Sequence, residues 1–338
     1  MAGRCNAGSA DLGAWGMDAF RQDTEYSHLQ FCRTPTVQEL AEIKRPFSID
    51  NLIGLLRDNE KNIFSLASER AIDPLTLRSQ LLLHLPQLFT TDDLPSERDI
   101  QRDILAVSDF VEDRQRPYAR WLKPPERPIA LNDLEFVSLD VKTAKIYHEC
   151  LHYIGSYRPG LHFAFRDKNS GRVVCIGSVA SFDLKHAEEK IVPAVDPKSA
   201  LMLSRFFAFR WAPERTFSHF HGKLRLKLIE EFDTKLMFSF VNPNLGFEAG
   251  SYRSANWTLF AHEEATRYMY LDRRYQTMRF FVNEYGTSDP VELKKKLGLS
   301  FEVSTMKLKP MWLYAIPLQR RARRAIPATP FVFERPVL

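Results

Sequence analysis

The residues with the clearest chemical potential follow an apolar run that ends at Trp211. The polar turn after it carries Arg215, and a basic amphipathic segment begins there, with Ser218 and Gly222 one turn apart. A strand that passes through a short loop into a helix presents free backbone N–H groups and the positive end of the helix dipole. Ser218 supplies a small side chain, and Gly222 permits close packing or approach. We therefore expect a phosphate site, with an ordinary strand-to-helix connection as the alternative.

Two asparagines and a tyrosine follow the next apolar run. Asn242 and Asn244 bracket Pro243 at its end, where a sheet opens to ligands, and Tyr252 falls in the following short helix. Asparagine at this place can bind an amide-bearing ligand or simply shape a turn. A buried phenol carries its proton at neutral pH and can protonate a leaving thiolate. Tyr252 is therefore a candidate general acid, with simple packing as the alternative.

A third polar group lies upstream, in a segment rich in side chains that can donate, accept or titrate. His148 and His152 are four residues apart, so they share one face of a helix. Tyr153 and Tyr157 follow within one turn and a loop. Together these four side chains offer aromatic faces and hydrogen-bonding edges, which is what a pocket for a planar base requires.

The same histidine pair can bind a metal, with Asp183 or Glu149 as a third ligand. A structural or surface histidine pair is the commoner outcome, so no metal is predicted. For the general base or the residue that orients the substrate, we predict His152 or Asp183.

Hydrophobic periodicity defines the elements that must position these residues. Apolar runs predict strands over 201–211, 235–241 and 266–272, and helical periodicity predicts a helix over 217–232 and a short helix around Tyr252. Upstream, 161–165 and 173–180 flank a glycine-containing turn and predict a hairpin, and 309–317 predicts a final strand. We therefore expect an α/β domain with a sheet flanked by helices.

The first third of the chain differs in pattern from the rest. Ser48 and Asp50 can cap a helix over 51–57, and a helix–turn–helix-like pair follows, whose second helix begins at Pro74 behind Asp73. Arg78 and Gln80 are the side chains that this second helix would offer to DNA bases, although its five leucines favour packing. A polar, proline-punctuated stretch over 92–126 indicates a linker. We predict a loose arm at 1–35, a helical region at 36–115, a linker at 116–128, a catalytic domain at 129–318 and a basic, proline-rich tail at 319–338.

Composition excludes several classes of protein. The 338 residues are 44% hydrophobic and 12% aromatic, which is typical of a globular chain with a large core. No apolar run approaches the ~18–20 residues of a membrane span, and the first thirty residues lack a secretory core. The four cysteines are widely spaced, as expected of reduced thiols in a cytosolic protein. The net charge of +5 favours an anionic partner only weakly.

The order of motifs resembles the GNAT acyl-CoA transferases. In that family, the loop after the fourth strand binds the CoA pyrophosphate, and a tyrosine in a later helix protonates the departing thiolate. The segment 215–220 (Arg-Thr-Phe-Ser-His-Phe) resembles the family motif Arg/Gln-x-x-Gly-x-Gly/Ala, with both glycines replaced. The resemblance implies a mixed, mostly antiparallel sheet flanked by helices, here with an N-terminal helical region, and acetyl-CoA as cofactor.

Longer strings resemble the phage Mom family, which is related to GNAT enzymes. They are 203–213, 241–257, 267–272 and 152–159, and the resemblance covers about residues 130 to 318. Members modify adenine in DNA to N6-(methylcarbamoyl)adenine, which protects phage genomes from restriction. The resemblance implies a DNA-modifying transferase that acts in the cytoplasm of the bacterial host, with DNA as partner and no membrane association.

Together, the residues and the resemblance define a candidate site. The predicted catalytic residues are Tyr252, His152 and Asp183, and the predicted substrate-binding residues are His148, Tyr153, Tyr157 and Arg205. The predicted cofactor-binding residues are Phe209, Arg210, Trp211, Arg215, Ser218, Gly222, Asn242, Asn244 and Asn256. Basic residues in the central stretch and at 320–324 would contact DNA phosphates.

Two alternatives stay open. The first is a GNAT N-acyltransferase whose acceptor is a small amine, a protein or tRNA. The second is a DNA-binding regulatory protein whose transferase domain is inactive. The oligomeric state does not follow from the sequence.

Overall fold

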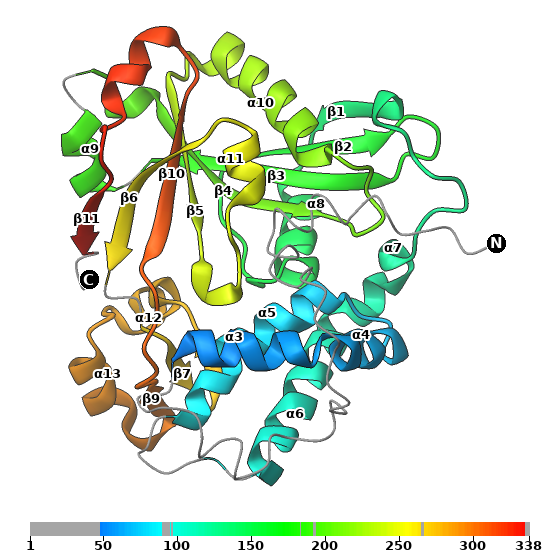
Figure 1. Ribbon diagram of the computed structural model, residues 1–338, viewed down its shortest axis with the longest axis vertical. Helices are drawn as coiled ribbons and strands as arrows, with labels where there is room; N and C mark the ends of the chain where they lie inside the picture. The colour runs from blue at the N-terminus through cyan, green and yellow to red at the C-terminus, as the bar shows by residue number, and fades with distance from the viewer. Residues whose placement is uncertain are drawn as a thin grey trace. The chain divides into compact units, whose positions relative to one another are not determined.

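The computed structural model of the chain describes residues 48–89, 95, 97–182, 184–191, 194–264 and 267–334 (Figure 1). The predicted N-terminal arm and the candidate residue Asp183 lie outside the described residues. Among the described residues, no helix is long and apolar enough to cross a membrane. The described chain divides into two compact units, one formed by Pro117–His262 and Met311–Phe333, and the other by residues 48–116 and Glu263–Pro310.

The first unit is built on an eight-stranded sheet with the order β1-β2-β3-β4-β5-β10-β6-β11. Every strand pairing with a described register is antiparallel except β4 with β5. The fold class, a mixed and mostly antiparallel sheet flanked by helices, is thus confirmed. The strands are β1 (Leu134–Ser138), β2 (Leu161–Asp167), β3 (Val173–Ser181), β4 (Ala200–Ala208), β5 (Leu236–Val241), β6 (Thr258–Glu264), β10 (Met311–Pro317) and β11 (Phe331–Glu334).

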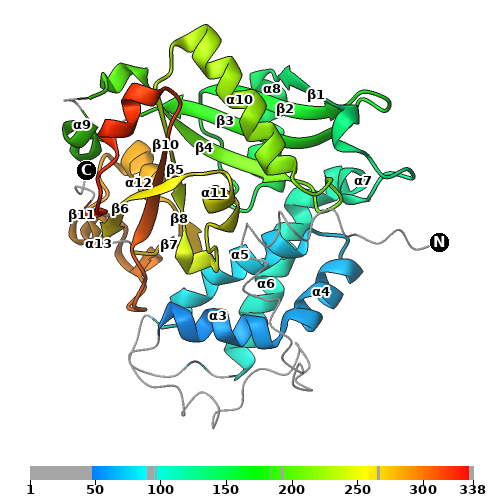
Figure 2. The same cartoon turned by 45° about the horizontal axis from the view of Figure 1, so that its top comes forward.

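Helix α10 (Thr216–Phe232) connects β4 to β5 and packs along one face of the sheet (Figure 2). Gly177 of β3 makes this packing possible, because a Cβ atom there would lie 2.4 Å from the ring of Phe220. The rings of Phe206, Phe217 and Phe220 contact one another on this face. A large aromatic core therefore holds α10 in place, as the apolar positions of the predicted helix require.

Shorter helices complete the first unit. They are α7 (Ala119–Leu122), α8 (Val141–Ile146) with a π-helical turn at Tyr147–Leu151, α9 (Lys185–Ile191) and α11 (Gly250–Ser254). Asp140 caps α8 by accepting a hydrogen bond from the N–H of Thr143. A single π-helical turn often marks a functional site, and this one carries His148.

The second unit combines helices from two parts of the chain with a small sheet. Helices α3 (Ile49–Asp58), α4 (Glu60–Glu69), α5 (Pro74–His84) and α6 (Glu97–Gln115) come from the first third of the chain. The strands β7 (Met269–Leu271), β8 (Arg274–Gln276) and β9 (Phe301–Val303) form the sheet, with helices α12 (Met278–Tyr285) and α13 (Pro290–Leu297). Tyr270 of β7 donates a hydrogen bond to the carbonyl of Leu83, which ties sheet to helices.

Two predicted N-caps of this unit, Ser48 and Asp73, are confirmed, whereas Asp50 lies within α3, which begins at Ile49. Ser48 and Asn51 form a reciprocal capping box at α3, and Asp73 caps α5 with Pro74 in its first turn. Arg78 and Gln80 of α5 are only 4% and 3% exposed. Neither side chain is therefore accessible to a DNA base in this structure.

Three segments differ from the expected arrangement. The predicted strand at 266–272 includes β7, which belongs to the small sheet, and the neighbour of β10 in the large sheet is β6. The proline-punctuated stretch over 92–126 contains the 19-residue helix α6, because its apolar residues recur at helical spacing. Within 319–334 the chain forms a 3-10 helix (Arg320–Ala325) and the edge strand β11, since Ala322 and Ala325 insert into the core.

Candidate functional site

Strands β4 and β5 separate in the middle of the sheet. Their parallel pairing covers only three residue pairs, from Ala200–Leu236 to Met202–Phe238, although β4 continues to Ala208. The register between β3 and β4 also shifts after this point, so that Ser204 is an extra residue on β4. Such a bulge bends a strand and increases its twist. The bulge thus accounts for the divergence of β4 from β5, which we call the splay.

Tyr252 lies where the splay begins. The hydroxyl of Ser239 donates a hydrogen bond to the carbonyl of Leu203 at 2.9 Å, which joins β5 to β4 just beyond their last pair. The hydroxyl of Tyr252 lies 2.9 Å from the Oγ atom of Ser239. Because Ser239 has one proton, committed to Leu203, the phenol is the donor in this second bond. The sequence predicted a short helix around Tyr252, which is α11, but it did not predict the role of Ser239.

The surroundings of Tyr252 favour its protonated form. The side chain is 4% exposed and packs against the rings of Phe217, Trp257 and Tyr314. Burial raises the pKa of Tyr252 to about 12, and a hydrogen bond donated by the phenol to Ser239 also favours the protonated form. Tyr252 is therefore a neutral proton donor at physiological pH.

Buried polar atoms without hydrogen-bond partners surround this tyrosine. They are the Oγ atom of Ser251, the Nε1 atom of Trp257 and the Nε2 atom of His221. The ring of Trp257 lies 5.2 Å from those of both Tyr252 and His221. Because buried donors are costly when unpaired, these atoms are suited to hydrogen bonds with a bound amide or carbonyl. The residues present thus match the amide-bearing arm of an acyl-CoA in hydrogen-bonding chemistry, and they are only 3–4% exposed in this structure.

The turn after β4 is held by packing. The rings of Phe209 and Trp211 stack at 4.9 Å, and the guanidinium of Arg172 lies 4.7 Å from the indole of Trp211. The indole N–H of Trp211 donates to the carbonyl of Trp121. Phe209 and Trp211 are both buried, so their role in this structure is to fix the turn rather than to face a cofactor. Arg210 between them is half-buried.

The N-terminus of α10 has the features of a phosphate site. Its N-cap residue, Arg215, has a φ of 64° and gives the helix no side-chain cap, and the N–H of Thr216 donates to the carbonyl of Pro213 at 3.3 Å. Ser218 and Gly222 are both exposed. A Cβ atom on Gly222 would meet no atom within 4 Å, so this glycine is not required by packing inside the protein.

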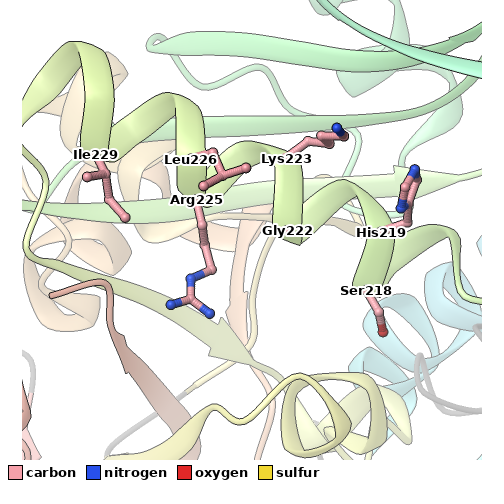
Figure 3. A pocket seen from close by; sticks show the side chains of 7 residues that line it. All are labelled: Ser218, His219, Gly222, Lys223, Arg225, Leu226 and Ile229. Carbon is pink, nitrogen blue, oxygen red and sulfur yellow. The ribbon is translucent and has the colours of Figure 1, made fainter. Parts of the chain in front are cut away.

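A surface pocket of about 360 Å³ runs along α10 from this end (Figure 3). Ser218, Gly222, Arg225 and Ile229 recur at helical spacing along one side, and His219, Lys223 and Leu226 complete the lining. The pocket combines two cations with apolar surface, which suits a ligand with phosphate groups and an apolar or aromatic part.

The three predicted asparagines have different environments. The Oδ1 atom of Asn242 accepts a hydrogen bond from the N–H of Asn244 at 3.0 Å and caps the 3-10 turn Pro243–Leu245. Asn242 therefore shapes the turn after β5, which is the alternative to ligand binding that the sequence left open for it. Asn244 is fully buried, whereas Asn256 is exposed with a φ of 62°, a conformation that asparagine tolerates.

A row of polar side chains crosses three strands on the face opposite α10. His162 of β2 pairs with Ser178 of β3, which pairs with Arg205 of β4, so the three side chains share one face. Gly177 faces α10, and successive side chains of a strand alternate, so Ser178 points away from α10. The guanidinium of Arg205 is held by the Oγ atom of Ser156 at 3.1 Å.

Hydrogen bonds link this row to two predicted residues. The Oγ atom of Ser178 lies 2.9 Å from the Nε2 atom of His148 and 2.8 Å from the Nδ1 atom of His162. The Nε2 atom of His162 lies 3.1 Å from the hydroxyl of Tyr157. Burial lowers the pKa of His148 to about 3, with further lowering by the charge of Arg205, and burial also lowers the pKa of His162.

His152 lies beside this row in a defined tautomer. Its Nδ1 atom accepts a hydrogen bond from the N–H of Ile154 at 3.1 Å, so the neutral ring carries its proton on Nε2. Its ring stacks on Tyr153 at 4.3 Å, and Tyr153 contacts Phe247 from the turn after β5. In this tautomer the Nε2 atom is a donor, which suits a residue that orients the substrate better than a general base.

The structure therefore brings together the four residues predicted to bind substrate, His148, Tyr153, Tyr157 and Arg205, and places His152, predicted as catalytic, beside them. Among the described residues, no group of three potential ligands could hold a metal ion. His162 and Ser178 were not predicted as site residues. The sequence feature that could have identified them is the predicted hairpin, because its register places His162 opposite Ser178. A register shift between Phe165 and Arg166 makes this pairing hard to deduce from the sequence.

Comparisons with known proteins give only distant structural similarities. No family model matches the chain, and no curated protein sequence matches it. Spermidine/spermine N-acetyltransferase from Vibrio cholerae shares 8% identity over 57% of this chain and 97% of its own, with a TM-score of 0.31. Ribosomal-protein-S5-alanine acetyltransferase from Vibrio fischeri shares 7% identity over 75% of this chain and 90% of its own, with a TM-score of 0.27. Aminoglycoside N(6')acetyltransferase from Legionella pneumophila shares 8% identity over 63% of this chain and 91% of its own, with a TM-score of 0.29.

Proposed function

We propose that this protein is a GNAT-like transferase that moves an acyl-type group from acyl-CoA to the exocyclic N6 amine of adenine in DNA. The observation that carries the transferase part is the splay between β4 and β5, with Tyr252 at its start and the N-terminus of α10, which lacks a side-chain cap, after the end of β4. When bound there, acetyl-CoA would supply a thioester, an electrophile that an amine can attack.

The residues around the splay divide the work between two faces of the sheet. On the α10 face, backbone N–H groups and Lys223 would hold phosphates, and Ser251 and Trp257 would bind the amide-bearing arm. Tyr252 would give its proton to the leaving thiolate after rotation of its C–O bond away from Ser239. On the opposite face, the stacked pair His152–Tyr153 would hold the acceptor.

Adenine fits this acceptor face chemically. Its exocyclic amine is a weak nucleophile that lies inside the duplex stack, so the base must be flipped or the strand must be single. An aromatic ring for stacking and an N–H donor for a ring nitrogen are what a flipped base requires, and Tyr153 and the Nε2 atom of His152 can supply them. The strings that resemble the Mom family include His152, Tyr153 and Tyr252.

Exposed basic side chains support a nucleic acid as the acceptor molecule. The 3-10 helix at 320–325 buries Ala322 and Ala325, which turns its four arginines, Arg320, Arg321, Arg323 and Arg324, to the surface. Lys227 forms an ion pair with Glu231, and Arg205 donates a hydrogen bond to Ser156. These two cations are therefore less available for contacts with DNA phosphates than we expected from the sequence. Each phosphate contact should lower the logarithm of the binding constant by about 0.7–0.9 per decade of salt.

The direct test is a thiol-release assay with purified protein and acetyl-CoA. Single-stranded oligonucleotides with and without adenine, spermidine and a lysine peptide would be compared as acceptors. We expect release of CoA only with adenine-containing DNA, and a rate that falls steeply with salt. Release with spermidine or the peptide alone would instead establish an N-acyltransferase with another acceptor. DNA binding without any acetyl-CoA binding would favour the regulatory alternative.

The added group requires its own measurement. A methylcarbamoyl group contains a nitrogen atom that acetyl-CoA does not supply, so transfer of acetyl alone would give N6-acetyladenine. The mass of the modified nucleoside distinguishes these products.

A further inference from the structure

We infer that Tyr157, His162, Ser178 and His148 form a proton relay, in which Tyr157 takes the proton that the acceptor amine loses and passes its own proton to His162. This inference rests on the proposed acyl transfer to an amine. The four side chains form one unbroken series of hydrogen bonds of 2.8–3.1 Å, from a half-buried hydroxyl to a fully buried imidazole.

The number of protons in the series limits its polarity, which is the direction in which its hydrogen bonds are donated. Ser178 has one hydroxyl proton and two histidine nitrogens beside it, so at least one histidine must donate to it. If His162 carries its proton on Nδ1, it donates to Ser178, and Ser178 donates to His148. The Nε2 atom of His162 is then free to accept from Tyr157, and the oxygen of Tyr157 turns a lone pair outward.

This polarity is complementary to an amine. An acceptor amine brings N–H groups, which pair with an outward lone pair and not with an outward O–H. In the opposite polarity, His162 would donate to Tyr157, and Tyr157 would present a proton to the amine. Only the first arrangement can remove a proton from the attacking nitrogen.

The step balances without a further reactant. As the C–N bond forms and the C–S bond breaks, one proton leaves the nitrogen for Tyr157, whose own proton moves to the Nε2 atom of His162. The leaving thiolate takes the proton of Tyr252. The proton on His162 returns to solvent through Tyr157 once the product has left, and Tyr252 regains a proton, so the net transfer is one proton from nitrogen to sulfur.

The surroundings keep the relay neutral between turnovers. His148 and Ser178 are fully buried, and His162 is 4% exposed. The charge of Arg205 and the rings of His152 and Tyr157 face His148, and none of these neighbours is an anion that would favour an imidazolium. Burial lowers the pKa of His162 itself, so a proton that it accepts is released readily, which a relay requires. His148 and Ser178 act as positioning residues, because they fix the tautomer of His162.

The tautomer can be measured directly by NMR of protein labelled with ¹⁵N-histidine, with His162→Asn used to assign the signal. We expect His162 to be neutral at pH 7, with its proton on Nδ1 and a bare Nε2. A proton on Nε2 with a bare Nδ1 would overturn the relay, whatever the activity of the enzyme.

Kinetics give the second readout. Tyr157→Phe and His162→Asn should each lower kcat for acyl transfer by about 10²-fold, because general-base assistance has this size. The double variant should lose little more than either single variant, and the Kd for acetyl-CoA should not change. Tyr285→Phe and His262→Gln serve as matched controls outside the site and should keep full activity.

Two failures can be told apart. A wild-type protein that binds acetyl-CoA but acylates no amine would overturn the proposed function, and the NMR measurement would still decide the polarity of the series. An active enzyme in which Tyr157→Phe retains the wild-type kcat would overturn the relay and leave the transferase intact. Ser178→Ala should move the acid limb of the pH–rate profile, which a purely structural serine would not do.

Discussion

Tyr252 combines burial with a hydrogen bond to Ser239, and its pKa of about 12 follows from the burial. A phenol in this state stays protonated through the physiological range and is available as an acid at every turnover. Tyr252→Phe removes the hydroxyl and leaves the bond from Ser239 to Leu203 in place, so the fold and the splay should be retained.

We expect Tyr252→Phe to lower kcat for CoA release by about 10²–10³-fold with an unchanged Kd for acetyl-CoA. The thiol-release assay and calorimetry measure these two quantities. In the wild type, no loss of rate from deprotonation of Tyr252 is expected below pH 11. Full activity of the phenylalanine variant would exclude Tyr252 as the acid.

At the scale of elements, α10 contains a glycine that the protein itself does not need. Gly222 lies in the middle of a 17-residue helix with open space beside it, so Gly222→Ala should raise the free energy of unfolding by up to about 1 kcal/mol. If a phosphate group of acyl-CoA approaches the helix there, the added methyl group should weaken acetyl-CoA binding. Urea denaturation and calorimetry would test the two effects separately. A stabilised variant with wild-type affinity would show that the ligand does not reach Gly222.

The elements of the sheet were largely predictable from the sequence, but their relations were not. Apolar periodicity and caps predicted α5, α10, β5 and the β2–β3 hairpin, because each is defined by local chemistry. The splay depends on a bulge at Ser204 and on a pairing that stops after Met202, and neither leaves a local signal.

The same contrast applies to the candidate site. Tyr252 followed from its place after β5, whereas the partners Ser239 and Ser178 are ordinary serines until the strands are paired. Phe209 and Trp211 were predicted to bind the cofactor; in the structure their rings stack on each other, and the indole N–H of Trp211 donates to a backbone carbonyl. Sequence patterns identify residue types, and the pairing of strands decides what each residue contacts.

For the whole molecule, buried neutral histidines predict a specific response to pH. Burial lowers the pKa of His84 to about 4 and the pKa values of His148 and His221 to about 3. Below the unfolded pKa of about 6.5, the unfolded chain binds protons that the folded chain does not. The free energy of unfolding should therefore fall as pH drops from about 6.5 to 4, by up to about 1.4 kcal/mol per pH unit for each histidine.

Urea denaturation over this pH range would measure the slope. His221→Phe provides a matched variant, because the ring of His221 stacks on Phe217 and its Nε2 atom has no hydrogen-bond partner. In this variant, the free energy of unfolding should change less steeply with pH, because the contribution of one histidine is removed. An unchanged slope would mean that His221 is not protonated more readily in the unfolded chain.

The most direct test of the central claim is mass spectrometry of nucleosides from plasmid DNA, after expression in a host without adenine modification of its own. We predict a new deoxyadenosine adduct with the wild-type protein and none with Tyr252→Phe. The mass of the adduct would also identify the transferred group. Unmodified deoxyadenosine from cells that contain folded protein able to bind acetyl-CoA would contradict adenine in DNA as the acceptor.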